Sequence, residues 1–590
     1  MRLPQLALLL LACAVPATGA RAQASRLDSL DAYVRTQMAR RQIRGLSLAI
    51  IQNGRIDAAR AYGVADDSTR APVTTATLFQ AGSISKPVSA LGALHLVEAG
   101  RLSLDGDVNA QLRAWKVPAN RFTATAKVTL RRLLSHNAGT TVHGFPGYDV
   151  AGPVPSLIQV LDGAPPANTS PIRVDTVPGA IWRYSGGGFT IMQELVIDVT
   201  RMPFPRFVQE TVLGPIGMTS SSYEQPPTAA RAALNASGYY ADRTPVRGRW
   251  HVYPEMAAAG LWTTPTDLAR FAIEIQETLA GHGHGVISPA MARQYLTVQK
   301  APSGLGIIVD SSGHALRFSH GGRDEGFDAQ LMAFAHTGQG AVIMINANDN
   351  SRFMGRLLDY IARAWGWPRE APAGPPAATR GMPVAAPLLS EYAGYYEAAE
   401  NQMIALAPAA QSDGLETLVD GLPDEAFPAI DSTRFGSTER PVRFAVAREG
   451  HGEAGAVVWT SADGRERRMP RIAPLPSTAQ PGPDPDTALA RRIGAALEAL
   501  RQGGNALADA RDLTPGARQD FAAGIGSTLD RSGPLSYVGE TDVAGHGLHR
   551  HGSDVARVRF YRMPTVAGDR YLFVHLTAEG LVTDYDVVDR

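Results

Sequence analysis

The spacing of apolar residues predicts that the folded part of the chain begins with a helix and a β-hairpin. Apolar residues recur at helical intervals over residues 27–43. Two runs with strand character follow at 46–51 and 56–62, on either side of Asn53-Gly54, a dipeptide typical of hairpin turns.

A second helical pattern starts at Ser83 and stops at Gly100, a residue suited to the left-handed position that closes a helix. From about 105 to 300 the chain is rich in proline and glycine, with intermittent helical patterns such as 267–279, and strand-like runs return over 304–347. Strands at both ends of a helical middle predict one α/β domain with an inserted helical region. Ser83 is expected at the start of a helix.

Beyond this region the pattern changes twice. A helical pattern at 354–365 leads into a proline-rich stretch with the composition of an extended linker, so the first domain is expected to span residues 23–375. Short alternating runs predict a small β-sheet domain over 385–474. A helix followed by strand-like runs predicts an α+β C-terminal domain over 486–590.

Composition narrows the class of protein without naming a function. The 590 residues carry a formal net charge of zero, so nothing indicates a surface for nucleic acid, and no such partner is expected. Lysine is rare, because Lys86, Lys116, Lys127 and Lys300 are the only four and arginine supplies every other basic side chain.

The N-terminus is typical of an export signal. A charged Met1-Arg2 precedes an apolar run at 6–15 and the small-residue site Ala20-Arg21-Ala22, which predicts a signal peptide of residues 1–22 and a periplasmic or secreted protein. No later stretch has the length of a membrane span. Cys13 is the only cysteine, so the mature chain is expected to lack disulfides and cysteine chemistry, unless Cys13 serves as the lipid-anchored cysteine of a lipoprotein.

Ser83-Ile84-Ser85-Lys86 fits the pattern S-x-x-K. On a helix, residues three apart lie on one face with about 5 to 6 Å between their Cβ atoms, so a hydroxyl and an amine can share a hydrogen bond. A serine hydroxyl is a weak nucleophile until a base removes its proton, and a neutral amine can be that base. The helix N-terminus also offers backbone N–H groups to a developing oxyanion. S-x-x-K is common by chance, so this motif alone leaves a structural role open.

Two further segments carry candidate chemistry. Tyr184 enters a glycine-rich stretch, 186–188, expected to form a turn, and a phenol near Lys86 would relay a proton to a leaving group. The run 320–323, His-Gly-Gly-Arg, closes a predicted strand, where two glycines would let a substrate backbone approach closely. Each segment also has a structural interpretation, a buried loop-capping tyrosine in one and a hairpin histidine without a ligand in the other.

No grouping of His, Asp, Glu or Cys has the spacing of metal ligands. His282 and His284 flank Gly283 in a predicted flexible loop, where a surface role is expected. The sequence therefore implies neither a metal nor another cofactor.

Together the three segments resemble the serine β-lactamase family, particularly the class C enzymes, the D-alanyl-D-alanine carboxypeptidases and the related esterases. That family carries S-x-x-K, then Y-x-N, then K-T-G or H-x-G. This chain has Ser83 to Lys86, Tyr184 to Gly186 and His320 to Gly322 in the same order and over similar intervals. Residues 79–82, 133–139 and 264–271 add to the resemblance, which covers about residues 27–367.

The resemblance implies a β-lactamase/transpeptidase-like fold, with an antiparallel sheet flanked by helices and a mainly helical subdomain. It also implies that an ester or amide acylates Ser83, that Lys86 and Tyr184 exchange protons, and that water then cleaves the acyl-enzyme. The substrate would be a small-molecule ester, amide or peptide. The backbone N–H groups of Ser83 and Arg323 would form the oxyanion hole. The other residues expected at the substrate are Gly186, His320, Gly321 and Gly322.

Two departures from the family pattern bear on the substrate. Gly186 stands where the family usually has an amide side chain, and His320 replaces the usual lysine. Arg323 or a protonated His320 would then have to attract a substrate carboxylate. These departures favour esterase or peptidase activity over strong β-lactamase activity. They also motivate an alternative, a catalytically silent sensor or binding protein of the penicillin-binding kind, although Ser83, Lys86 and Tyr184 argue against it.

Overall fold

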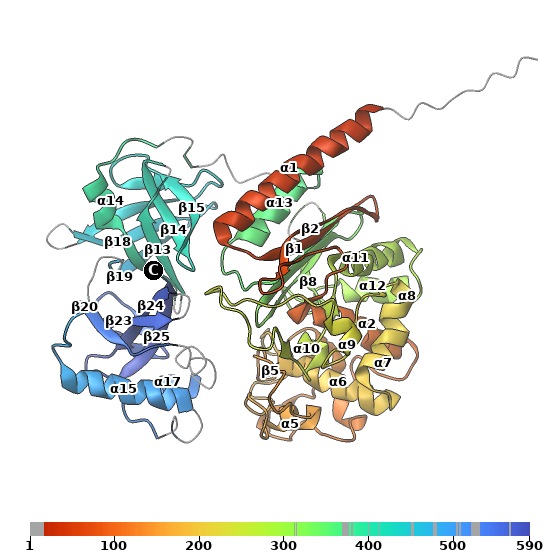
Figure 1. Cartoon of the computed structure of the whole chain (residues 1–590). Helices are drawn as coiled ribbons and strands as arrows, with labels where there is room; N and C mark the ends of the chain where they lie inside the picture. Colours follow the sequence, from red (N-terminus) through yellow and green to blue (C-terminus); the bar gives the residue numbers. More distant parts are fainter. Residues whose placement is uncertain are drawn as a thin grey trace, which may run out of the picture.

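The chain folds into two lobes, shown in Figure 1, in a computed structural model. The structure describes residues 17–311, 313, 315–368, 377–378, 381–399, 402–410, 412–449, 453–475, 481–502, 506, 509–520, 532–565 and 568–589. The apolar run and Cys13 of the predicted signal peptide lie outside the described residues, as does most of the predicted linker. The predicted cleavage site at 20–22 falls within the first helix, α1 (Ala17–Arg41).

The first lobe combines one sheet with many helices. Its strands are β1 (Gly45–Gln52), β2 (Arg55–Asp66), β3 (Ala71–Pro72), β4 (Phe79–Gln80), β5 (Tyr148–Asp149), β6 (His251–Val252), β7 (Trp262–Thr263), β8 (Ile308–Asp310), β9 (Arg317–Asp324), β10 (Phe327–Phe334) and β11 (Gly340–Ile345). After α1 its helices are η1 (Gly82–Ile84), α2 (Ser85–Glu98), η2 (Val108–Ala110), α3 (Arg121–Thr125), α4 (Leu130–Leu134), α5 (Leu157–Asp162), α6 (Gly186–Thr200), α7 (Phe204–Val208), η3 (Gln209–Leu213), α8 (Gly214–Ile216), α9 (Ala229–Ala232), α10 (Met256–Ala259), α11 (Pro265–Ala280), α12 (Pro289–Tyr295) and α13 (Phe353–Ala364).

A seven-stranded antiparallel sheet joins the two ends of this lobe, in the order β3-β2-β1-β11-β10-β9-β8. The predicted N-terminal hairpin supplies β1 and β2, and the predicted later strands supply β8 to β11. The two sets meet where β1 pairs with β11, with Leu46 opposite Ile345 and Ile51 opposite Gly340. The predicted α/β domain with a helical insertion is therefore confirmed.

Both faces of this sheet are covered, so β1 is apolar at successive positions. Leu46, Leu48 and Ile50 belong to the core beneath α1 and α13, two helices that lie side by side across the sheet in Figure 1. Ala49 and Ile51 point the other way, into the core shared with the helical region. Because successive strand residues face opposite sides, this alternation fixes which sheet face meets the helical region.

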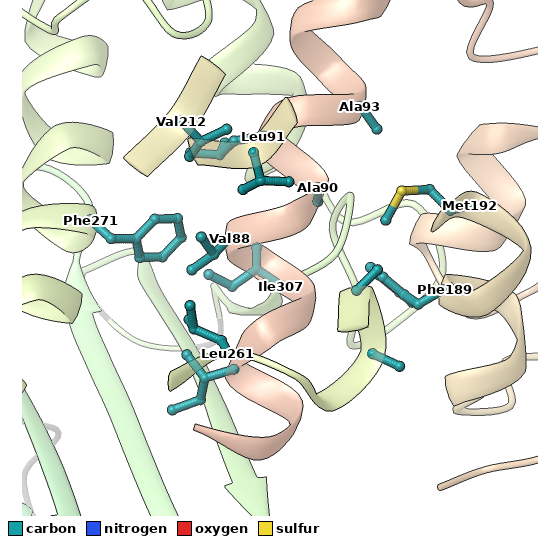
Figure 2. Packing of buried hydrophobic residues seen from close by; sticks show 14 of the residues in the cluster. Val88, Ala90, Leu91, Ala93, Phe189, Met192, Val212, Leu261, Phe271 and Ile307 are labelled. Carbon is teal, nitrogen blue, oxygen red and sulfur yellow. The ribbon is translucent and has the colours of Figure 1, made fainter. Parts of the chain in front are cut away.

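Helix α2, which begins directly after Ser83, runs through the middle of the helical region. Its residues from Ser85 to Leu94 are buried, and a helix that is apolar on every side has to be surrounded. Figure 2 shows Val88 on the side of Phe271 of α11, with Phe189 and Met192 of α6 on the opposite side. The lobe thus holds α2 rigidly, and Ser83 lies at its N-terminal end.

The second lobe contains two β-rich parts. The first part has α14 (Ala386–Tyr392), β12 (Gly394–Ala399), β13 (Gln402–Pro408), β14 (Gly414–Val419), β15 (Leu422–Pro428), β16 (Arg434–Gly436), β17 (Arg443–Glu449), β18 (Glu453–Thr460) and β19 (Glu466–Ala473). The second part has α15 (Thr487–Gln502), α17 (Pro515–Asp520), β20 (Ser536–Asp542), β21 (His549–Arg550), β22 (Ser553–Asp554), β23 (Arg557–Thr565), β24 (Gly568–Leu576) and β25 (Val582–Asp589).

Strands β12 to β19 form one eight-stranded antiparallel sheet, in the order β15-β14-β13-β12-β19-β18-β17-β16. Its two outer strands, β15 and β16, are consecutive in the chain and are bridged between Ala429 and Phe435. The sheet therefore curls around its own core, which is rich in aromatic side chains such as Phe427, Phe444 and Tyr396.

The second part builds a four-stranded sheet, β20-β23-β24-β25, that is covered on both faces. Leu572 and Val574 of β24 share a core with α15 and α17. The alternate residues Tyr571 and Phe573 share a core with Tyr395 and other residues of the eight-stranded sheet. The two C-terminal parts are thus joined by a common hydrophobic core.

The hairpin of β14 and β15 lies against the first lobe. Arg356 of α13 donates to Asp424 with 2.6 Å between Nη2 and Oδ1, and Arg352 donates to Glu425 at 3.3 Å. The lobes are therefore joined by contacts between charged side chains in addition to their covalent connection. Among the helices of the described residues, none combines the length and apolar character needed to cross a membrane.

Candidate active site

Ser83 and Lys86 meet at the junction of η1 and α2. The Nζ atom of Lys86 lies 2.9 Å from Oγ of Ser83 and 2.9 Å from the carbonyl oxygen of Ala258 in α10. Lys86 is 2% exposed, whereas Ser83 is half-buried. Ser83 is therefore partly accessible, and the amine beside it is buried and held in place by a second hydrogen bond.

Two glycines let η1 pack directly on β9. A Cβ atom at Gly82 would lie 2.4 Å from the backbone nitrogen of Arg323, and Gly82 has a positive φ of 50°. A Cβ atom at Gly322 would lie 1.9 Å from the carbonyl oxygen of Ala81. The backbone that approaches Gly322 on this side is thus the protein's own, and a substrate contact at Gly322 stays a prediction. At Gly321 a Cβ atom would meet only Gln330 Oε1 at 3.5 Å and Ala329 O at 4.0 Å, so the expectation stays open there.

The pairing of β9 directs the backbone N–H of Arg323 toward η1. Asp324 pairs with Phe327 across a two-residue turn, and the pair that closes such a hairpin exchanges hydrogen bonds, so the N–H and C=O of the neighbouring residue, Arg323, point to the outer edge. On that edge β8 pairs with residues 317–319 of β9, and η1 lies beyond. The N–H of Arg323 thus points toward the segment that carries Ser83, and an oxyanion hole formed by these two residues stays a prediction.

Tyr184 lies next to the serine and lysine. The Nζ atom of Lys86 lies over its ring, 5.0 Å from the centroid, and the ring of His320 lies 6.1 Å away. The three separate sequence segments therefore converge on one place. The sequence predicted that Tyr184 enters a glycine-rich turn. The structure has no such turn at this place.

The glycine-rich stretch 186–188 is the first turn of α6, which corrects the predicted turn. Ser185 caps this helix, with its Oγ accepting from the N–H of Gly188 at 3.1 Å. Glycine is required because a Cβ at Gly187 would lie 2.6 Å from the carbonyl oxygen of Thr141, and one at Gly186 would lie 2.8 Å from the ring of Phe145. The aromatic ring of Phe145 thus fills the space next to Gly186.

His320 lies in the site as a neutral group. It is 4% exposed, and burial together with the charge of Lys86 lowers the pKa of His320 to about 4. Its Nδ1 lies 2.6 Å from the carbonyl oxygen of Gly321, and since a carbonyl only accepts, Nδ1 carries the proton. Its Nε2 is buried without a hydrogen-bond partner among the described residues, so it is available to accept from a substrate or from water.

The side chain of Arg323 points away from the nucleophile. Its Nε and Nη2 atoms form two hydrogen bonds to Asp328, at 2.7 and 2.6 Å, because Arg323 and Asp328 are cross-strand neighbours on one sheet face. Together with the neutral state of His320, this pairing corrects the expectation that either residue attracts a substrate carboxylate.

His136 is a site residue that the sequence analysis did not single out. Its ring lies 4.3 Å from the ring of Tyr184 and 5.4 Å from that of Phe189, and its Nδ1 accepts from the N–H of Ser185 at 3.2 Å. Burial lowers the pKa of His136 well below its usual range. This neutral ring orients Tyr184, and its only sequence signal was its place in the segment 133–139.

Two buried acids near the site were also missed. Burial raises the pKa of Asp324 well above its usual range, while the charge of Lys86 opposes the rise. Burial raises the pKa of Glu255, the residue before α10, to about 8. Asp324 was predictable, because alternation along β9 places it on the same sheet face as His320 and Gly322, whereas no pattern marks Glu255.

Metal ligation finds no support in the described part of the chain, where no group of three or more His, Cys, Asp or Glu side chains is placed to hold a metal ion. Of the two loop histidines, His284 forms a pair with Glu274, with 2.6 Å between Nδ1 and Oε2.

A family model described as "Beta-lactamase" matches residues 30–364, more than half of the chain. The chain belongs to the beta-lactamase family. Its family relatives include protein flp of Staphylococcus aureus strain N315, 22% identical over 358 residues, which cover 57% of this chain and 65% of flp. A beta-lactamase of Pseudomonas fluorescens is 29% identical over 245 residues, 41% of this chain and 62% of that protein. The chain thus spans less than two thirds of the length of these relatives.

Among solved structures, the beta-lactamase fold of this chain is similar to that of the octameric penicillin-binding protein homologue from Pyrococcus abyssi, with a TM-score of 0.52 and 19% identity. The likeness covers 75% of this chain and 99% of that one, a larger share of this chain than the family match.

Proposed function

We propose that this beta-lactamase family member is a serine hydrolase that cleaves an ester or amide through an acyl-enzyme on Ser83. One observation carries the proposal, the 2.9 Å contact between Nζ of the buried Lys86 and Oγ of the half-buried Ser83. A hydroxyl and an amine in hydrogen-bond contact are the parts that an activated serine requires.

The first half of the proposed reaction forms the acyl-enzyme. Oγ of Ser83 attacks the substrate carbonyl carbon, and its proton passes to the amine of Lys86, which acts as a base in its unprotonated form. The developing oxyanion is stabilised by the backbone N–H groups of Ser83 and Arg323 and by the N-terminal end of α2. Tyr184, over whose ring Nζ lies, relays the proton to the leaving oxygen or nitrogen.

The second half releases the acyl group. A water molecule attacks the ester carbonyl on Ser83, and the same groups carry its proton back to Oγ. Nε2 of His320 lies in the site with its lone pair unused among the described residues and serves as a further acceptor for this water or for a substrate N–H.

The site favours neutral substrates. Arg323 is bound to Asp328, and His320 is neutral at pH 7 because of its lowered pKa, so neither supplies a cation for a substrate carboxylate. The ring of Phe145 fills the space beside Gly186, which suits an apolar acyl group. We therefore propose esterase or neutral-amide hydrolase activity over hydrolysis of penicillins, in an enzyme exported to the periplasm or beyond by its predicted signal peptide.

The test compares deacylation of two reagents by intact-mass spectrometry. Purified full-length protein is mixed with a nitrophenyl ester or with a penicillin, and the acylated fraction is followed over time. We expect rapid turnover of the ester and little acylation by the penicillin. An acyl-enzyme that forms with either reagent and persists would instead establish the catalytically silent sensor.

A further inference from the structure

The hairpin turn between β14 and β15, residues 419–422, docks against the first lobe behind β9. The side chain of Arg41, from the end of α1, is 1% exposed and donates to the carbonyl oxygens of Val419 and Leu422, at 3.1 and 3.2 Å. Arg243 donates to the carbonyl oxygen of Asp420 at 2.7 Å. Two arginines of the first lobe therefore hold the backbone of this turn.

A chain of hydrogen bonds runs from the tip of this hairpin to Arg323. Nδ2 of Asn350 donates to Oδ1 of Asp420 at 2.8 Å, and the backbone N–H of Asn350 reaches Oδ2 of the same carboxylate at 3.3 Å. On its other side, Oδ1 of Asn350 accepts from Nη1 of Arg323 at 2.7 Å. Asn350 thus links the C-terminal lobe to the end of β9.

Arg323 is held from several directions at once. Besides Asn350, it donates to both carboxylate oxygens of Asp328 and, through Nη2, to the backbone carbonyl of Asp349 at 2.9 Å. The backbone of the same residue meets Gly82, beside the nucleophile, with no room for a Cβ atom. A shift of Arg323 by a few tenths of an ångström would therefore displace the backbone next to Ser83.

We propose that Asp420 and Asn350 are positioning residues, through which the appended β-sheet lobe fixes the oxyanion N–H of Arg323. The inference rests on the proposed function, because it assigns a role to residues outside the site in that reaction. Neither residue touches the substrate, and each acts through the guanidinium of Arg323.

The chain itself offers a control for mere docking. The pair of Arg356 and Asp424, 2.6 Å apart and both buried, joins β15 of the same hairpin to the first lobe, and within the described structure neither side chain hydrogen-bonds to Asn350 or Arg323. Asp424→Asn weakens docking without entering the proposed path. Asp420 has a positive φ of 52° at the hairpin tip, a conformation that glycine and asparagine tolerate. Asp420→Gly and Asp420→Asn therefore keep the backbone of the turn, and both remove the 3.7 Å ion pair between Asp420 and Arg41, so that only the hydrogen bond to Asn350 distinguishes them.

The experiment measures kcat and KM for a nitrophenyl ester, the inhibition constant of phenylboronic acid, and Tm, in full-length protein. The boronate forms a tetrahedral adduct on the serine and places an oxygen in the oxyanion hole. We expect Asp420→Gly and Asn350→Ala to lower kcat about tenfold with nearly unchanged KM, and to weaken boronate binding in parallel. Asp420→Asn should restore most of kcat, and Asp424→Asn should leave it within about twofold.

Three results overturn the inference. One is equal loss of kcat in Asp420→Gly and Asp424→Asn, which would make docking the whole effect. Another is a fall in Tm with kcat and boronate affinity unchanged. If wild-type protein neither turns over the ester nor binds the boronate, the proposed function fails and this inference fails with it, a result distinguishable from the first two.

Discussion

Buried charge in the C-terminal lobe differs from buried charge at the active site. In the C-terminal lobe, Arg550 is fully buried, contacts Glu397 and lies 3.0 Å from Asp584. Arg559, also buried, lies 2.8 Å from an oxygen of each of two acids. In the active-site lobe, Lys86 is just as buried, yet its described hydrogen bonds go to a hydroxyl and a carbonyl rather than to a carboxylate.

Burial shifts two titratable groups near the site, His320 and Glu255, toward their neutral forms. Burial moves the pKa of His320 down to about 4 and that of Glu255 up to about 8, so each is held in its neutral form at pH 7. The buried arginines paired with carboxylates hold the fold together. The titratable groups near Ser83 that lack an ionic partner are the ones suited to exchange protons. This contrast separates the structural interior from the reactive one.

The largest expected effect comes from replacing Lys86, whose described hydrogen bonds include no carboxylate. Lys86→Gln should lower kcat/KM for a nitrophenyl ester by about 10³-fold, because Ser83 loses its base while the packing of α2 is kept. Steady-state kinetics measure the change. Lys127→Gln is the matched control, since Lys127 is mostly exposed, and equal activity in both variants would contradict the assignment.

The paired charge should show the reverse behaviour. Arg550→Met should lower the free energy of unfolding by about 3 to 5 kcal/mol, because Glu397 and Asp584 are left buried without their partner. Urea denaturation measures this loss. Activity per folded molecule should hold, and a variant as stable as wild type would show that the pairing contributes nothing.

Glu255→Gln should change how stability depends on pH. The folded-state pKa of about 8 lies above the unfolded value, so the folded protein binds the extra proton and this stabilisation is lost as pH rises from about 4.5 to 8. The loss between pH 5 and 7.5 is about 3 kcal/mol from this group. When Tm is measured against pH, the variant should show a flatter profile in that window. A profile identical to that of wild type would refute the raised pKa of Glu255.

His320→Gln should act in the acid range with the opposite sign. The folded-state pKa of about 4 lies below the unfolded value, so this histidine contributes stability above pH 6.5 that is lost as pH falls toward 4, about 3 kcal/mol at most. The variant should lose less stability than wild type between pH 6.5 and 4. Parallel curves for the two proteins would exclude a buried neutral histidine.

Much of the fold could be predicted because its signals are local. The helix and hairpin before residue 62, the helix from Ser83 and the strands after residue 304 each follow from the spacing of apolar residues within one element. The order of the three motifs then indicated the site. Such signals do not depend on distant parts of the chain.

What the sequence could not predict depends on contacts between distant segments. Residues 186–188 were expected to form a turn because three glycines favour one, but they begin a helix since the neighbouring loop packs where side chains would be. The role of Gly322 follows from the approach of Ala81. The alternation of side chains along β9 does predict that Arg323 and His320 point to opposite faces of the sheet. The partner of Arg323, Asp328, becomes apparent only once the strands pair.

The most direct test of the central claim, that Ser83 is an activated nucleophile, is intact-mass spectrometry of wild type and Ser83→Ala after exposure to a fluorophosphonate, with nitrophenyl-ester turnover measured in the same samples. We expect one adduct on wild type, none on Ser83→Ala, and loss of turnover in the variant with an unchanged Tm. An equal adduct on both proteins, or undiminished turnover by Ser83→Ala, would contradict the claim.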